Sequence, residues 1–394
     1  MTERNFTMSN INMACDFCGA ALDDVYHATP SPRGMVVCVC SGCGLVQSRQ
    51  TGSPPTETIR TTSSEADWGN IRHGKGARLQ PSLKILQAHA VFDSVTRVLD
   101  IGSNRGHFVQ WLHATHPQIA CVAVEPDGSV VSNYATQPGL TLHLSRFEAM
   151  QFAPGSFDLI YSSHSLEHAD SAAAMMRHSY EILAEGGWLY LEVPNLQAIG
   201  ERDIVEEFFI DKHSFHFDPV TLGAFCESLG FEQVNPAQDT DAFNLCLLLR
   251  KSGTPKPFVG APTHAAPQRA LIDGYRQTLA ANRQMLHSVV TRYLAPLAAR
   301  QKVGYWGAGR IFDALVKFGG LDPRQIHCLV DAHLAGIVPQ VHGVPIQPPR
   351  ALKRAEPQVV VVLGRSSEQE MARQAQAFGI RHVLKFSDLL AQCR

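Results

Sequence analysis

The chain has 394 residues, of which 45% are hydrophobic and 18% are charged, and its formal net charge is −2. This composition favours packed globular domains over disorder, and the length predicts two or three of them. A nearly neutral chain argues against a nucleic-acid-binding surface, and no apolar run reaches the roughly 18 residues that a membrane span needs. The N-terminal residues lack the apolar core of a signal peptide, so we expect a cytoplasmic protein.

Two C-x-x-C pairs stand near the N-terminus. Cys15 and Cys18 form the first, Cys40 and Cys43 form the second, and 21 residues separate them. Four thiolates at this spacing are typical of a closed tetrahedral zinc site. Surface thiols, and Cys38 in place of Cys40, are the alternatives. We predict a structural Zn(2+) ion in a zinc-binding domain over residues 1–60.

A loop rich in Thr, Ser and Pro covers residues 47–66, and Ala66–Arg78 follows with glycines, one tryptophan and several basic side chains. One interpretation is a solvated surface loop. The other is a lid in which Arg72, Lys75 or Arg78 contacts an anionic substrate.

The sequence V-L-D-I-G-S-N-R-G follows, over residues 98–106. It reads as a strand that ends near Asp100, a glycine loop and the start of a helix. Gly102 and Gly106 let the backbone turn sharply and approach a ligand. Asn104 stands where a dinucleotide-binding loop has its second glycine, so the loop suits a phosphate-free cofactor. This segment resembles the first motif of the class I S-adenosylmethionine (SAM) methyltransferases.

That resemblance implies further cofactor-binding residues. Glu125 ends the second strand, where an acid can accept the ribose hydroxyls. A backbone amide near Phe147 or Glu148 would meet the adenine edge, and His164 would face the methionine part of SAM.

Strand and helix patterns then alternate up to residue 250, with a helix over 171–183 that stops at Gly186-Gly187, a strand over 188–195 and a helix over 217–230 capped by Asp218. The predicted fold class is α/β: a Rossmann-like class I SAM methyltransferase core over residues 61–250, with the N-terminal zinc-binding domain and a C-terminal Rossmann-like α/β domain.

The loop G-S-N-x-G at 102–106 is similar to the G-S-N-D-G loop of the sugar C-methyltransferases, which act on nucleotide-linked 4-keto-deoxysugars. The resemblance extends over nearly the full length and implies a nucleotide-sugar substrate. In that family E-V-P is followed by a Tyr-His-Glu-His segment that supplies the catalytic base. Here His213 matches the final histidine, whereas Ile210, Asp211 and Lys212 stand at the three positions before it.

C-methylation requires removal of a proton beside a carbonyl and stabilisation of the enolate. His213 is the predicted general base, and Lys212 or His216 would stabilise the enolate. An O- or N-methyltransferase needs only a base, which His213 serves equally well. A packing or capping role for His213 is the third alternative.

Residues 251–300 read as a linker and a connecting helix, and residues 301–394 as the C-terminal α/β domain with a second strand–glycine–helix unit. Gly307 and Gly309 offer backbone N–H groups, and Arg310 a charge, to the diphosphate of a nucleotide-sugar. Phe312 replaces the third fingerprint glycine, which weighs against an NAD(P)-dependent oxidoreductase. A domain that only packs or dimerises, and a non-catalytic zinc-knuckle binding module, remain open. We expect a small-molecule partner, no nucleic acid, no membrane, and a monomer or homodimer.

Overall fold

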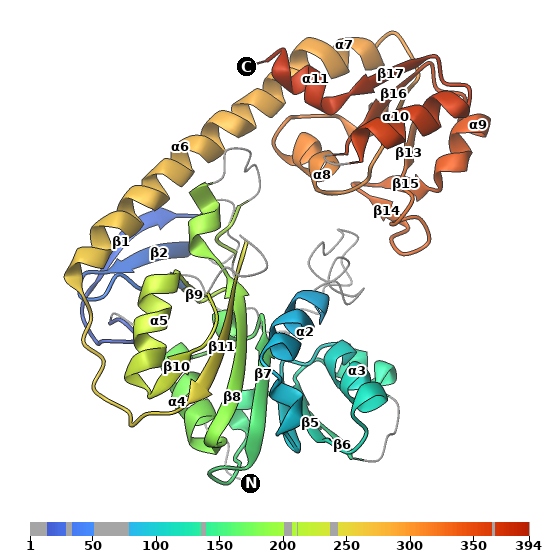
Figure 1. Cartoon of the computed structure of the whole chain (residues 1–394). Helices are drawn as coiled ribbons and strands as arrows, with labels where there is room; N and C mark the ends of the chain where they lie inside the picture. Colours follow the sequence, from blue (N-terminus) through green and yellow to red (C-terminus); the bar gives the residue numbers. More distant parts are fainter. Residues whose placement is uncertain are drawn as a thin grey trace, which may run out of the picture. The chain divides into compact units, whose positions relative to one another are not determined.

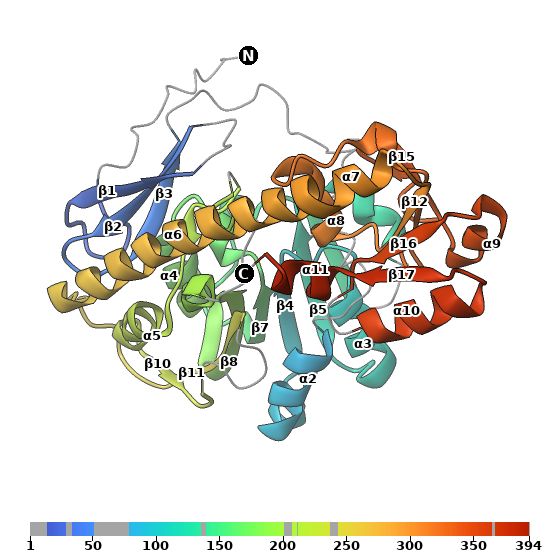
Figure 2. The same ribbon diagram turned by 90° about the horizontal axis from the view of Figure 1, so that it is seen from above.

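The computed structural model describes residues 14–28, 34–50, 79–134, 139–200, 207–210, 212–236, 243–364 and 367–393. The described residues form two compact units. The first contains two β-sheets and the start of the long helix α6, and the second contains the end of that helix and a third sheet (Figure 1, Figure 2). Within the described ranges, no helix is long and apolar enough to cross a membrane.

The N-terminal sheet is antiparallel and has the order β1-β2-β3-β9. Its first three strands follow one another in the chain, and β2 is buried along its whole length. The fourth, β9, comes from much later in the sequence. The bounds are β1 (Leu22–His27), β2 (Met35–Cys40), β3 (Val46–Gln50) and β9 (Phe215–His216).

The central sheet has seven strands in the order β10-β11-β8-β7-β4-β5-β6. Strand β11 is antiparallel to both of its neighbours, and the pairs from β8 to β6 are all parallel. The predicted α/β class is confirmed. The bounds are β4 (Arg97–Ile101), β5 (Ala120–Glu125), β6 (Leu140–Leu144), β7 (Phe157–Ser163), β8 (Leu183–Pro194), β10 (Phe231–Gln233) and β11 (Asn244–Lys251).

Helices cover both faces of this sheet: α2 (Leu79–Ala88) and α3 (His107–Thr115) on one, α4 (Ala172–Ile182) and α5 (Pro219–Ser228) on the other (Figure 1). The predicted cap of α5 is confirmed, because the Asp218 carboxylate accepts from the amides of Val220 and Thr221. Short helical turns connect these elements: η1 (Val91–Asp93), η2 (Gly128–Asn133), η3 (Phe147–Ala149), η4 (Leu166–His168), η5 (Leu196–Gly200) and η6 (Pro262–His264).

The predicted helix stop at Gly186-Gly187 is wrong. Helix α4 ends at Ile182, and β8 begins directly at Leu183, so both glycines lie inside the strand. The register between β7 and β8 shifts there, and a Cβ atom on Gly187 would lie 2.8 Å from the carbonyl oxygen of Ala184. The glycines therefore accommodate an irregular strand, which their local sequence does not distinguish from a helix end.

The N-terminal segment packs against the α4 and α5 face of the central sheet. The ring of Phe17 stacks on Phe225 with centroids 3.8 Å apart. The carboxylate of Asp16 accepts from the Ser171 hydroxyl at 2.6 Å and from the amide of Ala173 at 2.7 Å, at the start of α4. Apolar burial and a charged cap thus join this segment to the central sheet.

The predicted connecting helix is α6 (Ala265–Val289), continued by a π-helical turn, η7 (Val290–Leu294), and by α7 (Ala295–Ala298). In the second unit, the sheet order is β14-β15-β13-β12-β16-β17, and the strand–glycine–helix unit is β12 and α8. The strands are β12 (Val303–Trp306), β13 (Cys328–Val330), β14 (Gln340–Val341), β15 (Val344–Gln347), β16 (Val359–Val362) and β17 (His382–Lys385); the helices are α8 (Arg310–Lys317), η8 (Pro323–Gln325), η9 (Pro349–Ala351), α9 (Leu352–Ala355), α10 (Glu368–Ala377) and α11 (Phe386–Ala391).

Candidate active site

The glycine loop between β4 and α3 needs its glycines. Gly102 and Gly106 have φ values of +70° and +71°. A Cβ atom on Gly102 would lie 2.0 Å from the Ser165 hydroxyl oxygen, and one on Gly106 would lie 2.9 Å from the ring of Tyr134. Asn104 is also left-handed, at φ +47°, which asparagine tolerates better than most residues. The loop is therefore fixed by close contacts with the turns after β7 and β5.

Glu125 holds this loop in place. Its carboxylate accepts from the amide of Asn104 at 2.7 Å and from the amide of Asp127 at 2.8 Å. Burial raises the pKa of Glu125 in spite of these bonds. Asp100 is buried on β4, and burial together with the charge of Glu125 raises its pKa well above the usual value. Both predicted acids thus lie beside the glycine loop.

The turn after β6 carries the residues predicted to meet adenine. Phe147 is buried, with its ring centroid 5.0 Å from that of His178. The carboxylate of Glu148 accepts from the amide of Asp170 at 3.2 Å and pairs with Arg146 at 2.9 Å. Burial acts to raise the pKa of Glu148, but the bonds from Arg146 lower it overall. These contacts tie the turn after β6 to the turn after β7.

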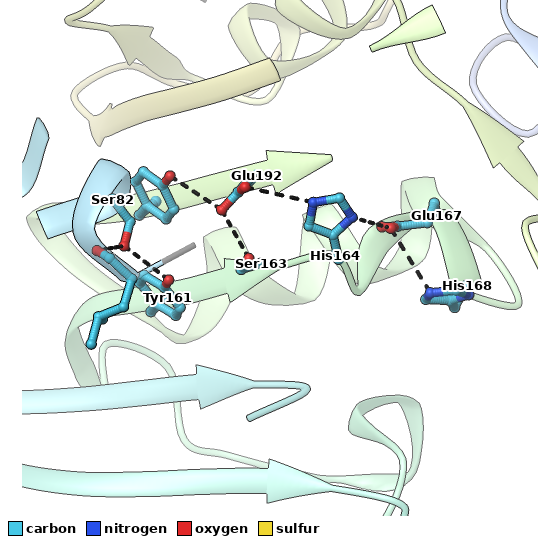
Figure 3. Close-up of polar contacts among 9 residues, drawn as sticks. Ser82, Tyr161, Ser163, His164, Glu167, His168 and Glu192 are labelled. Atoms are coloured by element: carbon cyan, nitrogen blue, oxygen red, sulfur yellow. Dashed lines mark hydrogen bonds and ion pairs between the residues drawn. The ribbon is translucent and has the colours of Figure 1, made fainter. Parts of the chain in front are cut away.

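His164 follows the carboxyl end of β7 and lies between two glutamates (Figure 3). Its Nδ1 is 3.0 Å from Oε1 of Glu167, and its Nε2 is 3.5 Å from Oε1 of Glu192 on β8. The Ser163 hydroxyl donates to the other oxygen of Glu192 at 2.9 Å. His164 therefore lies at this edge of the sheet, and both ring nitrogens face carboxylates.

His213 approaches the same cluster from the segment before β9. One polar atom each of Glu167, His168 and His213 lies within 4.8 Å of the other two. The amide of Ser214 donates to the carbonyl of Glu167 at 2.8 Å, which fixes the segment. Burial lowers the pKa of His213 well below the usual value, although the charge of Glu167 opposes this. Burial therefore favours the neutral form of the ring.

The other two predicted catalytic residues differ from each other. Lys212 has an exposed side chain, and its carbonyl oxygen lies 2.8 Å from Nδ1 of His168. His216 is buried on β9, with Nε2 2.7 Å from the Ser48 hydroxyl, and burial lowers its pKa to about 3. An exposed ammonium can stabilise an enolate, whereas a buried neutral ring with a structural partner is less suited to that role.

The sequence analysis did not assign roles to Glu167 and Glu192. One signal for Glu192 is present in the sequence, because it is the single charge in the strand W-L-Y-L-E-V-P. Register places Glu192 directly beside Ser163 on the neighbouring parallel strand. An acid at the carboxyl end of an apolar strand is a candidate for the ligand-binding edge of an α/β sheet.

The four predicted zinc ligands form one cluster. The sulfurs of Cys15 and Cys43 are 3.5 Å apart, those of Cys18 and Cys40 are 3.4 Å apart, and all four lie within 4.8 Å of one another. A tetrahedron with Zn–S bonds of about 2.3 Å has S···S edges of roughly 3.8 Å, so the set fits zinc. Cys38 lies apart from this cluster, with its thiol 3.3 Å from a carboxylate oxygen of Asp24.

In the second unit, Gly307 has φ +114° and Gly309 caps α8 in an extended conformation. A Cβ atom on Gly309 would meet no atom within 4 Å. Asp331 accepts from the amide of Ala308 at 3.0 Å, so its carboxylate braces the loop itself. Arg310 begins α8. The predicted substrate contacts Arg72, Lys75 and Arg78 lie outside the described residues.

Residues 74–235 match a family model described as a methyltransferase domain. This part of the chain is a methyltransferase domain. The chain is 31% identical over 150 residues to a tRNA U34 carboxymethyltransferase from Desulforapulum autotrophicum, covering 35% of this chain and 45% of that relative, less than half its length. Among solved structures, SAM-dependent methyltransferases from Mesorhizobium loti and Archaeoglobus fulgidus are similar. They show 15% and 19% identity, TM-scores of 0.33 and 0.36, and coverage of 39% and 47% of this chain and of 90% and 100% of their own chains.

Proposed function

We propose that this methyltransferase methylates a carbon of a nucleotide-linked 4-keto-deoxysugar, with His213 as the general base. The observation that carries the proposal is the place of His213: a neutral imidazole at the carboxyl edge of the sheet, beside the buried Glu167. It occupies the position that holds the base in the sugar C-methyltransferases that this chain resembles.

Different residues of the chain are proposed to bind the cofactor, remove the proton and stabilise the developing charge. The loop from Gly102 to Gly106 and the carboxylate of Glu125 hold the cofactor, which supplies an activated methyl group when bound. His213 takes the proton from the carbon beside the substrate carbonyl, so the C–H bond breaks and an N–H bond forms. The ammonium of Lys212 offsets the charge that develops on the carbonyl oxygen. With the cofactor bound, the carbon would form its bond to the methyl group as the methyl–sulfur bond breaks, and the neutral thioether would leave.

The four-cysteine cluster is proposed to hold a structural zinc ion. Its chemistry supports this, because the amides of Gly42 and Cys43 approach Sγ of Cys40 at 3.3 and 3.4 Å, as they do around metal-bound thiolates. All four donors are cysteines, which leaves no open coordination position. The metal would therefore stabilise the fold and take no part in methyl transfer.

For the nucleotide part of the substrate, we propose the loop at Gly307 and Gly309 together with Arg310. The open space at Gly309 and the start of α8 support a diphosphate there. Arg72, Lys75 and Arg78 are proposed as further contacts to the anionic substrate. A cytoplasmic location fits a substrate of this class.

One observation favours a second candidate, a nucleic-acid acceptor: the relative from Desulforapulum is named a tRNA carboxymethyltransferase. The net charge of −2 supports a small molecule instead, because binding of tRNA relies on clustered positive charge.

Mass spectrometry after incubation of the protein with SAM and a panel of TDP-linked 4-keto-sugars tests the proposal, with unmodified tRNA as a parallel acceptor. A sugar that is heavier by one methyl group, and that exchanges its neighbouring proton in deuterated water, is expected. Methylation on oxygen or nitrogen would move the assignment to the O- or N-methyltransferases, and methylated tRNA would overturn it.

A further inference from the structure

Two buried acids and half-buried imidazoles form a chain of polar contacts along the carboxyl edge of β7 and β8. The proposed methyl transfer uses only His213, at the end of this chain. Glu192 lies at one end, His164 in the middle and Glu167 at the other end (Figure 3). Glu167 in turn groups with His213. Glu192 and Glu167 are 3% and 1% exposed. Ionised carboxylates are very costly at such depth unless a cation neutralises them.

His164 lies within reach of both glutamates, and as an imidazolium it would offset one of their two negative charges. Its two ring nitrogens face one carboxylate oxygen each, at 3.0 Å and 3.5 Å. A neutral imidazole has only one N–H group, so it can donate to only one of these carboxylates, whereas an imidazolium can donate to both. The backbone supports this placement at some cost, because His164 has φ +55°, a conformation uncommon outside glycine.

Glu167 retains capacity for one more partner. Its Oε1 faces His164 and lies 3.8 Å from Nε2 of His168. Its Oε2 is buried and has no hydrogen-bond partner among the described residues. A buried carboxylate oxygen without a donor is unfavourable, and the N–H group that His213 gains on protonation would satisfy it.

We infer that Glu192, His164 and Glu167 form a buried charge relay that positions His213 and stabilises the imidazolium it forms. Glu167 is the positioning residue, and the proton stays on His213 until solvent removes it. This inference rests on the proposed function of His213. Burial acts to raise the pKa of Glu167, and the three surrounding histidines lower it to about 2, in agreement with a permanently ionised acid.

Among the described residues, four charged or titratable groups act on His213. Glu167 and His168 come from the turn η4, and Lys212 and His216 from its own segment. Among them Glu167 is the single anion, so its removal should act on His213 directly. His164 competes with His213 for that anion, so its removal should act in the opposite direction.

The test is an NMR titration of the His213 ring in the full chain with SAM added, with H213N used to assign the resonance. In E167Q the His213 pKa is expected to fall by at least one unit, a tenfold change in its protonation equilibrium. In H164N, where asparagine tolerates the left-handed backbone, it is expected to rise. E181Q, which removes an exposed carboxylate from α4, is the matched control and should leave it unchanged.

An unchanged His213 pKa in E167Q with wild-type SAM affinity would overturn the relay. If E167Q fails to fold, H164N decides: a rise supports the relay, and no change overturns it. If the His213 pKa falls in E167Q and rises in H164N but no sugar is methylated, the relay is supported and the sugar substrate is refuted. If a sugar is methylated but the His213 pKa does not change in either variant, the sugar substrate is supported and the relay is refuted.

Discussion

Replacement of Asp16 by alanine tests how the cysteine cluster supports the enzyme. Asp16 lies between Cys15 and Cys18, and its carboxylate accepts from Ser171 and Ala173 at the start of α4. Hydrogen bonds to a charged group contribute about 1.5–3 kcal/mol each. Because the two share one half-buried carboxylate and are not additive, we expect D16A to lower the free energy of unfolding by about 2–3 kcal/mol.

Thermal denaturation measures this loss. At roughly 2–4 °C per kcal/mol for a unit of this size, the Tm should fall by about 5–10 °C. D170A is the matched control, because Asp170 is an exposed partner of Arg146 at 3.0 Å, and its removal should cost no more than about 1 kcal/mol.

A second experiment measures the effect of D16A on the Tm in the presence and absence of a chelator. If the cluster holds the proposed zinc ion, chelation should release the turn that carries Asp16, and D16A should then add little to the loss. The reasoning would be refuted if D16A lowered the Tm by the same amount with and without the chelator. It would also be refuted if D16A had the same Tm as the wild type.

Three further outcomes are expected. H213N should lower kcat on the methylated substrate by about 10²–10⁴-fold and leave SAM affinity unchanged; an equal loss of both would assign His213 a structural role. G102A should weaken SAM binding at least tenfold in calorimetry, because its Cβ would lie 2.0 Å from the Ser165 hydroxyl oxygen at φ +70°. Burial acts to raise the pKa of Asp158, but bonds from Arg97 and Thr96 lower it to about 2. Its stabilisation is therefore present above pH 4 and lost as the pH falls towards 2. In urea denaturation at pH 6, the free energy of unfolding of the wild type should exceed that of D158N by about 1 kcal/mol, a value reduced for solvent screening of the partly exposed pair. This difference in free energy should disappear at low pH. A gap that stays constant with pH would contradict the ionic origin.

The methyltransferase core could be predicted because its signals are local. Gly102 and Gly106 lie a few residues apart, and alternation of strand and helix patterns identifies the sheet without knowledge of any distant contact. The cap at Asp218 has the same origin, since Pro219 follows it directly. The cysteine cluster was found by spacing alone.

The relay could not be predicted in this way. Glu192 and His164 meet because β7 and β8 are parallel neighbours, and a pairing across almost thirty residues leaves no periodic trace. The structure also places Glu167 in the short turn η4, outside the helix that the sequence predicts over residues 171–183. A helix there would turn the side chains differently, so the cluster depends on that turn.

The segment that carries His213 makes backbone hydrogen bonds to both the central sheet's side of the molecule and the N-terminal sheet. The amide of Ser214 donates to the carbonyl of Glu167 in the turn η4, which follows β7 of the central sheet. The carbonyl of Ser214 accepts from the amide of Ser48 in β3 of the N-terminal sheet. Strand β9 then pairs with β3 for only two residues, too few to hold alone. The position of the proposed base is therefore set jointly by the methyltransferase core and by the strands next to the cysteine cluster. This gives the small N-terminal sheet a reason to be part of the enzyme, although none of the four clustered cysteines takes part in the proposed chemistry.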